Sequence, residues 1–253
     1  MITANLSGRA VLVTGASSGI GLATARLAAS CGARVALNHL PDDPRGPSEV
    51  AALRAEGFDV IAAPGTVAER PAAEAMTRAA IDALGRLDHL VNNAGTAHVR
   101  EPVRIDDLDA VTDDLWDAVL ATNLRGSFAC ARAAAPALKA ARGGITNIAS
   151  VAGLTQPGSS MAYGASKAGV ISLTRNLARA LAPEVRVNAI APGLVLTPWT
   201  APWPEARKAG SAEAALLKRN CTPDDIAEAV LFFIAGAAMV TGQVLVVDGG
   251  RVL

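Results

Sequence analysis

The chain has 253 residues, its 23 Lys and Arg residues are balanced by 23 Asp and Glu residues, and 51% of its residues are hydrophobic. Such a chain is long enough to bury a sizeable core and too apolar to be disordered. Its neutral charge excludes a general attraction to nucleic acid or to an anionic membrane surface. No apolar run approaches the ~20 residues of a membrane helix.

The cysteines and histidines set further limits. Three cysteines are far apart in the chain, and three histidines lack metal-ligand spacing. We therefore expect reduced thiols and no metal site. The amino-terminal residues do not show a basic segment followed by a long apolar one, so no signal peptide is expected. These features predict a cytoplasmic protein.

Short β-branched runs alternate with alanine-rich helical segments along the chain. Strands are predicted at residues 10–14, 34–38, 59–62, 89–91, 145–148, 186–190 and 244–247. Helices are predicted at residues 20–31, 48–57, 70–84, 112–135, 162–181 and 223–234. Because alternating strands and helices form parallel sheets covered on both faces, we expect a single-domain, doubly wound α/β fold over residues 1–253. Its sheet would have seven strands and be mostly parallel.

The first strand leads into the sequence TGASSGIG, residues 14–21, and then into the first helix. Gly15 allows a tight turn, while Gly19 and Gly21 remove side chains where a ligand and the helix approach closely. A helix amino terminus presents free N–H groups, which favours a phosphate. The alternative is a plain glycine-rich turn.

The only tyrosine of the chain, Tyr163, lies four residues before Lys167. This spacing puts both side chains on one face of a helix. A free phenol has a pKa near ~10, and an adjacent ammonium favours the phenolate, so the pair is suited to general acid–base catalysis. Taken alone, such a pair is also common on a solvated helix face.

Further motifs follow in order: NNAG at residues 92–95, then Asn123, Ser150, and a Pro-Gly pair before Thr197. With the TGxxxGxG loop and the Tyr-x-x-x-Lys pair, they resemble the classical short-chain dehydrogenase/reductase family over almost the whole chain. The resemblance implies a Rossmann fold and an NAD(P)-dependent oxidoreductase that interconverts a ketone and a secondary alcohol. It also implies a homotetramer with a small-molecule substrate.

The resemblance assigns four catalytic roles. Tyr163 would protonate the carbonyl oxygen or deprotonate the alcohol, and Ser150 would hydrogen-bond that oxygen. Lys167 would lower the tyrosine pKa and hold the nicotinamide ribose, and Asn123 would hold a water that links Lys167 to solvent. The residues expected along the cofactor are Gly15, Ser17, Ser18, Gly19, Ile20, Gly21, Asn38, His39, Thr66, Val67, Asn93, Ala94, Gly95, Tyr163, Lys167, Pro192, Gly193, Val195 and Thr197.

Two positions depart from the family pattern. Thr66 stands where an aspartate often contacts adenine, and His39 stands where a carboxylate would bind the ribose 2′-hydroxyl and reject a 2′-phosphate. Arg45 is within reach of a 2′-phosphate, but Asp42 and Asp43 would oppose it. NADP(H) is therefore slightly favoured over NAD(H).

The proline-rich segment 194–222 interrupts the alternation and holds two of the three tryptophans. It is either a surface excursion with partly packed rings or a mobile lid over a substrate pocket. An apolar wall would favour a hydrophobic ketone over a sugar. The pocket residues expected are Val151, Met161, Trp199 and Trp203, with Leu194 and Leu196 beside them.

Three alternatives remain open. A nucleotide-sugar epimerase or dehydratase usually has a TGxxGxxG loop, which this chain lacks. A non-catalytic module that senses dinucleotide would tend to have lost Tyr163 or Lys167. A 3-oxoacyl-carrier-protein reductase is a narrower form of the main interpretation, and the basic residues it would need near the cleft are Arg100, Arg104, Arg125 and Arg132.

Overall fold

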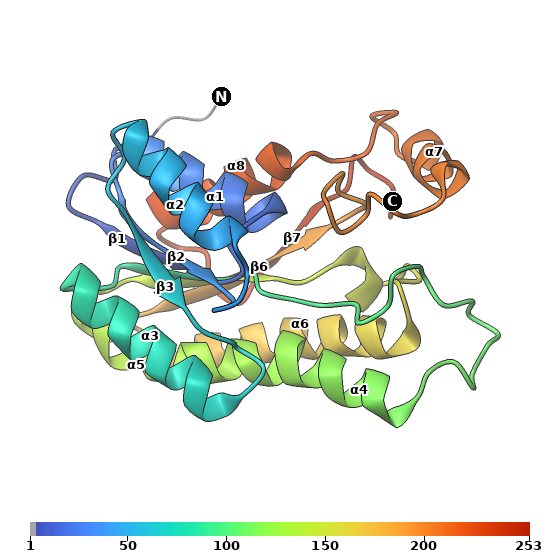
Figure 1. Cartoon of the computed structure of the whole chain (residues 1–253), viewed down its shortest axis with the longest axis horizontal. Helices are drawn as coiled ribbons and strands as arrows, with labels where there is room; N and C mark the ends of the chain where they lie inside the picture. Colours follow the sequence, from blue (N-terminus) through green and yellow to red (C-terminus); the bar gives the residue numbers. More distant parts are fainter. Residues whose placement is uncertain (1–3) are drawn as a thin grey trace.

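Parallel pairing joins all seven strands of residues 4–253, the part of the chain that the computed structural model describes, into one sheet (Figure 1). The strand order is β3-β2-β1-β4-β5-β6-β7, and every neighbouring pair is parallel. The chain moves outward from β1 to β3 and returns to β4 beside β1, which makes the edge between β1 and β4 the switch point. The strands are β1 (Ala10–Val13), β2 (Arg34–His39), β3 (Val60–Pro64), β4 (His89–Asn92), β5 (Gly144–Ile148), β6 (Arg186–Pro192) and β7 (Val244–Val247).

Helices cover both faces of the sheet. In Figure 1, α1, α2 and α8 lie on one side, and α3, α4, α5 and α6 lie on the other. This arrangement confirms the predicted doubly wound α/β class. The helices are α1 (Gly19–Ser30), α2 (Arg45–Ala55), α3 (Arg70–Leu84), α4 (Asp113–Leu120), α5 (Ser127–Ala141), α6 (Met161–Leu181), α7 (Glu205–Ala214) and α8 (Pro223–Ala235).

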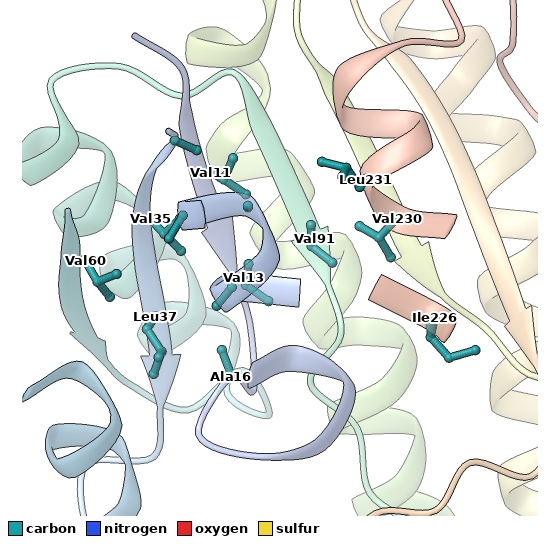
Figure 2. Packing of buried hydrophobic residues seen from close by; sticks show 14 of the residues in the cluster. Val11, Val13, Ala16, Val35, Leu37, Val60, Val91, Ile226, Val230 and Leu231 are labelled. Carbon is teal, nitrogen blue, oxygen red and sulfur yellow. The ribbon is translucent and has the colours of Figure 1, made fainter. Parts of the chain in front are cut away.

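Alternate side chains of the central strand reach opposite cores. Val11 and Val13 pack into the cluster that contains Val230 of α8 (Figure 2). Ala10 and Leu12 belong to the second cluster, which α3, α5 and α6 complete. Because both faces are buried, β1 is apolar at every position instead of alternating with polar residues.

Local sequence signals set the helix ends. Thr222 and Asp225 form a reciprocal capping box at the start of α8, and Pro223 occupies its first turn. Gly85 ends α3 with φ +76°, a left-handed conformation that favours glycine. The sequence predicts the start of α8 and the end of α3 to the residue for these reasons.

The predicted helix at residues 112–135 is wrong in two respects. A π-helix at Ala121–Gly126 separates α4 from α5, and α5 continues through Pro136 to Ala141. The Ser127 hydroxyl donates to the Asn123 carbonyl at 2.8 Å inside this wider turn. A π-turn adds a residue to the helical repeat, and hydrophobic periodicity at 3.6 residues per turn does not reveal it.

The segment 194–222 follows β6 at the carboxyl edge of the sheet and contains a helix that the sequence analysis did not predict. This helix, α7, begins after Pro204. An isolated bridge pairs Val195 with Cys221 and closes the base of the segment. The segment therefore leaves the sheet and returns to it before α8 begins.

Candidate active site

One cavity of about 950 Å³ extends along the carboxyl ends of the strands, from the glycine loop after β1 to Trp203. In open α/β sheets this edge is where ligands bind. Most predicted site residues line it together: Gly15, Ser17, Ser18, Gly19, Ile20, Asn38, His39, Thr66, Val67, Asn93, Ala94, Gly95, Ser150, Val151, Tyr163, Lys167, Pro192, Gly193, Val195, Thr197, Trp199 and Trp203.

The glycine loop leads directly into α1. Gly15 and Gly19 have φ of +60° and +56°, which side chains disfavour. Ser18 is the N-cap residue of α1 but makes no side-chain cap hydrogen bond, so the first N–H groups of the helix are available to an anion. Gly21 packs against the loop itself and does not line the described cavity. A Cβ at this position would lie 2.4 Å from the Gly15 carbonyl oxygen. The loop therefore fits a dinucleotide pyrophosphate.

Asn38, at the end of β2, holds two loops of the cavity in place. Its Oδ1 accepts the Gly15 N–H at 3.0 Å, and its Nδ2 donates to the carbonyls of Ala63 and Gly65, both at 2.9 Å. The next residue, His39, is buried, and its Nδ1 lies 2.8 Å from the Leu40 carbonyl oxygen. Since a carbonyl only accepts, Nδ1 carries the proton there.

A carboxylate reaches the glycine loop from the segment after β2. Asp43 accepts from the Ser17 hydroxyl at 2.7 Å and forms a two-pronged ion pair with Arg45, with both N–O distances 2.9 Å. Hydrogen bonds from Arg45 and Ser17 hold the pKa of Asp43 well below its usual range. The contact between Asp43 and Ser17 spans 26 residues, so no local signal in the sequence predicts it.

The NNAG residues bind the glycine loop from the other side of the switch point. The Asn93 amide donates to the carbonyls of Thr14 and Gly15, both at 2.9 Å. The Thr14 hydroxyl accepts the N–H groups of Asn93 and Ala94, both at 3.0 Å. Asn92 donates to Asn147 on β5 at 2.9 Å. This motif therefore braces the sheet centre.

Tyr163 and Lys167 lie on one face of α6, which begins at the N-cap residue Ser160. Lys167 is buried, and its Nζ donates to the Ile148 carbonyl at 2.7 Å. Nζ lies 5.7 Å from the centroid of the Tyr163 ring. The Ser150 hydroxyl accepts the Ala152 N–H at 3.1 Å, so its proton can be donated to the Tyr163 oxygen or to a substrate oxygen.

The pKa of Tyr163 was expected to be lowered by Lys167, and in the protein without bound cofactor this direction is wrong. Burial raises the pKa of Tyr163 to about 12, and the hydrogen bond with Ser150 opposes that rise without reversing it. Burial also lowers the pKa of Lys167 to about 8, because a low-polarity site disfavours the ammonium. Both shifts favour the neutral forms, and desolvation outweighs the attraction that the spacing suggested.

Asn123 lies behind the cavity wall and does not line the cavity formed by the described residues. Its amide exchanges hydrogen bonds with the backbone of Thr96, at 2.8 and 3.0 Å, and donates to the Ser166 hydroxyl at 3.0 Å. Asn123 therefore links the loop after β4 to α6.

The segment 194–222 supplies one wall near Tyr163. The Trp199 ring meets the Tyr163 ring edge to face, with centroids 5.8 Å apart. Leu194 also lines the cavity, whereas Met161 and Leu196 are 38% and 46% exposed and do not line it within the described residues. Met161, the first residue of α6, therefore lies outside the described lining that it was expected to join. Residues that the sequence analysis did not place here are Thr96, His98, Gln156, Thr200, Arg207 and Arg251.

A glycine loop at a helix amino terminus and a Tyr–Lys pair in the same cavity define a dinucleotide-dependent oxidoreductase. A family model described as Enoyl-(Acyl carrier protein) reductase matches residues 15–251. The chain is 36% identical to the 3-oxoacyl-[acyl-carrier-protein] reductase FabG of Thermotoga maritima, covering 98% of this chain and 99% of that protein. It belongs to the classical short-chain dehydrogenase/reductase family.

Two further relatives show the range of the family. The cis-4-hydroxycyclohexanecarboxylate dehydrogenase of Sinomonas cyclohexanicum is 38% identical, with 96% of each chain covered. A crystal structure titled short-chain dehydrogenase/reductase SDR, glucose/ribitol dehydrogenase, from Brucella melitensis has a TM-score of 0.88, 30% identity and full coverage of both chains. The chain is therefore an enzyme, an oxidoreductase for the ketone–alcohol pair with a nicotinamide dinucleotide cofactor.

No helix in residues 4–253 is long and apolar enough to cross a membrane.

Proposed function

We propose that this enzyme interconverts a hydrophobic ketone and its secondary alcohol, with Tyr163 as the group that gives or takes the proton. The observation that carries the proposal is the position of Tyr163, which lines the same cavity as Ser150, Lys167 and the glycine loop. A bound nicotinamide dinucleotide supplies or accepts the hydride. The residues of the chain bind the two reactants, orient them and move the proton.

Tyr163 is suited to protonating the oxygen in the direction of reduction. A pKa of about 12 keeps its hydroxyl protonated at neutral pH and therefore ready to donate. The proton of the Ser150 hydroxyl stabilises the negative charge that develops on the same oxygen. Lys167, with a pKa of about 8, exchanges protons near neutral pH and supports reprotonation of Tyr163. We infer a positioning role for Asn123, through Thr96 and Ser166.

The dinucleotide would extend from Thr197 and Pro192–Gly193 past Asn93 and the glycine loop to His39 and Thr66. We infer a slight preference for NADP(H), as no carboxylate follows β2 directly. Asp43 is the one acidic side chain among the described residues that line the cavity, and Arg45 already balances its charge. A 2′-phosphate would therefore meet no net negative charge there.

Reduction of a carrier-linked 3-oxoacyl group is the second candidate, and the similarity to 3-oxoacyl-[acyl-carrier-protein] reductases favours it. An acidic carrier needs unpaired basic residues near the cleft. Of the four expected arginines, Arg104 pairs with Asp106, and Arg132 pairs with Glu74. Arg100 and Arg125 are left for such a contact.

We also infer that residues 1–253 form one catalytic domain, with the segment 194–222 as its substrate lid. One continuous sheet and the contact between Trp199 and Tyr163 support this inference. A homotetramer in the cytoplasm remains the expected assembly and location. Small residues along α6 and three free cysteines support these expectations.

Tryptophan fluorescence, titrated separately with NADPH and NADH, tests the cofactor proposal, because Trp199 and Trp203 line the cavity. We expect both to bind and NADPH to bind more tightly. Turnover of simple aliphatic ketones with the tighter cofactor then tests the reaction. Tighter binding of NADH would overturn the inferred preference. Binding without turnover of any ketone or alcohol would contradict the proposed use of Tyr163.

A further inference from the structure

Two arginines line the cavity at its substrate end, Arg207 of α7 and Arg251 near the carboxyl terminus. Neither guanidinium forms a salt bridge with an acidic side chain of residues 4–253, although twelve such pairs occur elsewhere in that part of the chain. Arginines that lack an acidic partner inside a ligand cavity are candidates for binding an anionic ligand.

Arg207 is held close to the reacting tyrosine. Its guanidinium carbon lies 4.8 Å from the centroid of the Trp203 ring, and its Nη2 donates to the Gly158 carbonyl at 3.1 Å. Gly158 packs directly against the Tyr163 ring, since a Cβ on this glycine would lie 2.7 Å from Cδ1 of the tyrosine. One residue therefore separates the fixed guanidinium from the Tyr163 ring, and several of its N–H donors remain free.

Arg251 also contacts α7, although it comes from near the carboxyl terminus. Its Nη1 donates to the Ser211 hydroxyl, so α7 anchors both arginines. Burial and repulsion from the positive charge of Arg251 both lower the pKa of Arg207, in agreement with the anchoring of both side chains on α7. An anion between them would relieve that repulsion.

The charged side chains that line the described cavity leave this end positive. Asp248, three residues before Arg251, is buried outside that lining and accepts the backbone N–H groups of Gly250 and Val252. Asp43, the only acidic residue that lines the described cavity, is paired with Arg45 and bound to the glycine loop at the opposite end. Lys208 is also on α7, but it pairs with Glu205 and does not line the cavity. No carboxylate of the described lining is therefore available to neutralise Arg207 and Arg251.

We propose that Arg207 and Arg251 bind an anionic group, a carboxylate or a phosphate, on the part of the substrate away from its ketone or alcohol. This inference rests on the proposed function and narrows the substrate class to anionic ketones and alcohols with an apolar body. The planar guanidinium fork matches both oxyanions with two parallel hydrogen bonds. The tryptophan rings and Leu194 contact the apolar part, and the two arginines fix its orientation.

Two matched pairs of compounds test the charge requirement and its source. The first pair is 5-oxohexanoate and its neutral methyl ester. The second is S-acetoacetyl pantetheine and its 4′-phosphate. Binding is followed by tryptophan fluorescence and reduction by dinucleotide absorbance. We expect the anionic member of one pair to bind about tenfold or more tightly than its neutral partner. A preference in the first pair would indicate a small keto acid as the substrate, and a preference in the second would indicate a phosphate on a carrier arm. If both members bind equally in both pairs, the proposal is wrong.

Substitutions assign the preference to the two arginines. Arg207→Gln and Arg251→Gln should each reduce the preference for the anionic compound about tenfold, and KM should rise more than kcat falls. Arg251→Lys should retain more of this preference than Arg251→Gln. Lys208→Gln on the same helix should retain it. A thermal melt of each variant checks folding, and the lysine variant tests the charge if a glutamine variant is unfolded.

Binding of NADPH and NADH to the same variants separates this inference from the proposed function. We expect dinucleotide affinity to stay unchanged in both glutamine variants, and an equal loss of dinucleotide affinity would overturn the inference by assigning the arginines to the cofactor. If the wild-type enzyme turns over none of the four compounds and no other ketone or alcohol, the proposed function fails. The fluorescence titrations then still decide whether the arginines recognise an anion.

Discussion

At the glycine-loop end of the cavity, backbone atoms pack so closely that added side chains would collide with them, whereas α7, beside the substrate end, is mostly exposed to solvent. A Cβ on Gly21 would lie 2.4 Å from a backbone oxygen, and one on Gly15 would lie 2.8 Å from Ala94 Cα. Gly210, an exposed position of α7 outside the described cavity lining, has no atom within 4 Å of the equivalent position apart from its own helix backbone. The glycine-loop end suits a ligand of fixed shape, such as a dinucleotide. The residues at the substrate end can differ between enzymes that act on different substrates.

The largest effect is expected where the two regions meet, at Tyr163. Tyr163→Phe should lower kcat about 10²- to 10⁴-fold, because the variant cannot donate or accept the proton. Dinucleotide affinity should remain within about twofold of the wild type, since the aromatic ring is retained. Steady-state kinetics and fluorescence titration measure the two quantities. A variant with near wild-type kcat would show that another group carries the proton.

Lys167 lies at the same junction. We expect its buried ammonium to lower the free energy of unfolding, although the residue is needed for activity. Its pKa in the folded protein, about 8, is below the ordinary value of 10.5, so between these pH values the folded state binds fewer protons than the unfolded state. Wild-type stability therefore gains a contribution from this group as pH rises through that window.

Lys167→Met should consequently raise the free energy of unfolding at pH 7 by about 1–3 kcal/mol, after the lost hydrogen bond to Ile148 is allowed for, while activity falls. The difference from wild type should shrink as the pH is raised from 8 towards 10.5. Urea unfolding at pH 7 and at pH 10 measures it. A variant less stable than wild type at pH 7 would contradict the burial cost assigned to the ammonium.

Two alanine substitutions compare the packing of the two regions directly. Gly21→Ala should reduce stability by about 1–3 kcal/mol, because its Cβ would press on the Gly15 carbonyl and the Asn93 amide. Gly210→Ala should raise stability by up to about 1 kcal/mol, as it replaces a glycine inside α7 where space is open. Chemical denaturation measures the free energy of unfolding of both variants. Equal changes in the two variants would contradict the difference in packing between the regions.

A far smaller effect than at Tyr163 is expected at the adenosine end. Asp43→Asn should free Arg45 for a 2′-phosphate and tighten NADPH binding about tenfold, with little change for NADH. Asp42→Asn is the matched control, because Asp42 is exposed and does not line the described cavity. If NADH affinity falls instead, Asp43 contacts the ribose and NADP(H) is not the preferred cofactor.

The sequence by itself determined the layered α/β class, the glycine loop and the Tyr163–Lys167 face. These features depend on local rules, namely the period of apolar residues, the conformational freedom of glycine and the four-residue spacing along a helix. The helix ends at Gly85 and Thr222 belong to the same group, since their capping signals lie within a few residues.

Only the tertiary structure decided what depends on distant neighbours or on burial. The direction of the Tyr163 pKa shift follows from desolvation, which no spacing in the chain encodes. The contact of Asp43 with Ser17 joins residues 26 positions apart. Met161 does not line the described cavity although it lies two residues from Tyr163, whereas Arg251 reaches the cavity from near the end of the chain. Position in space follows how the elements pack.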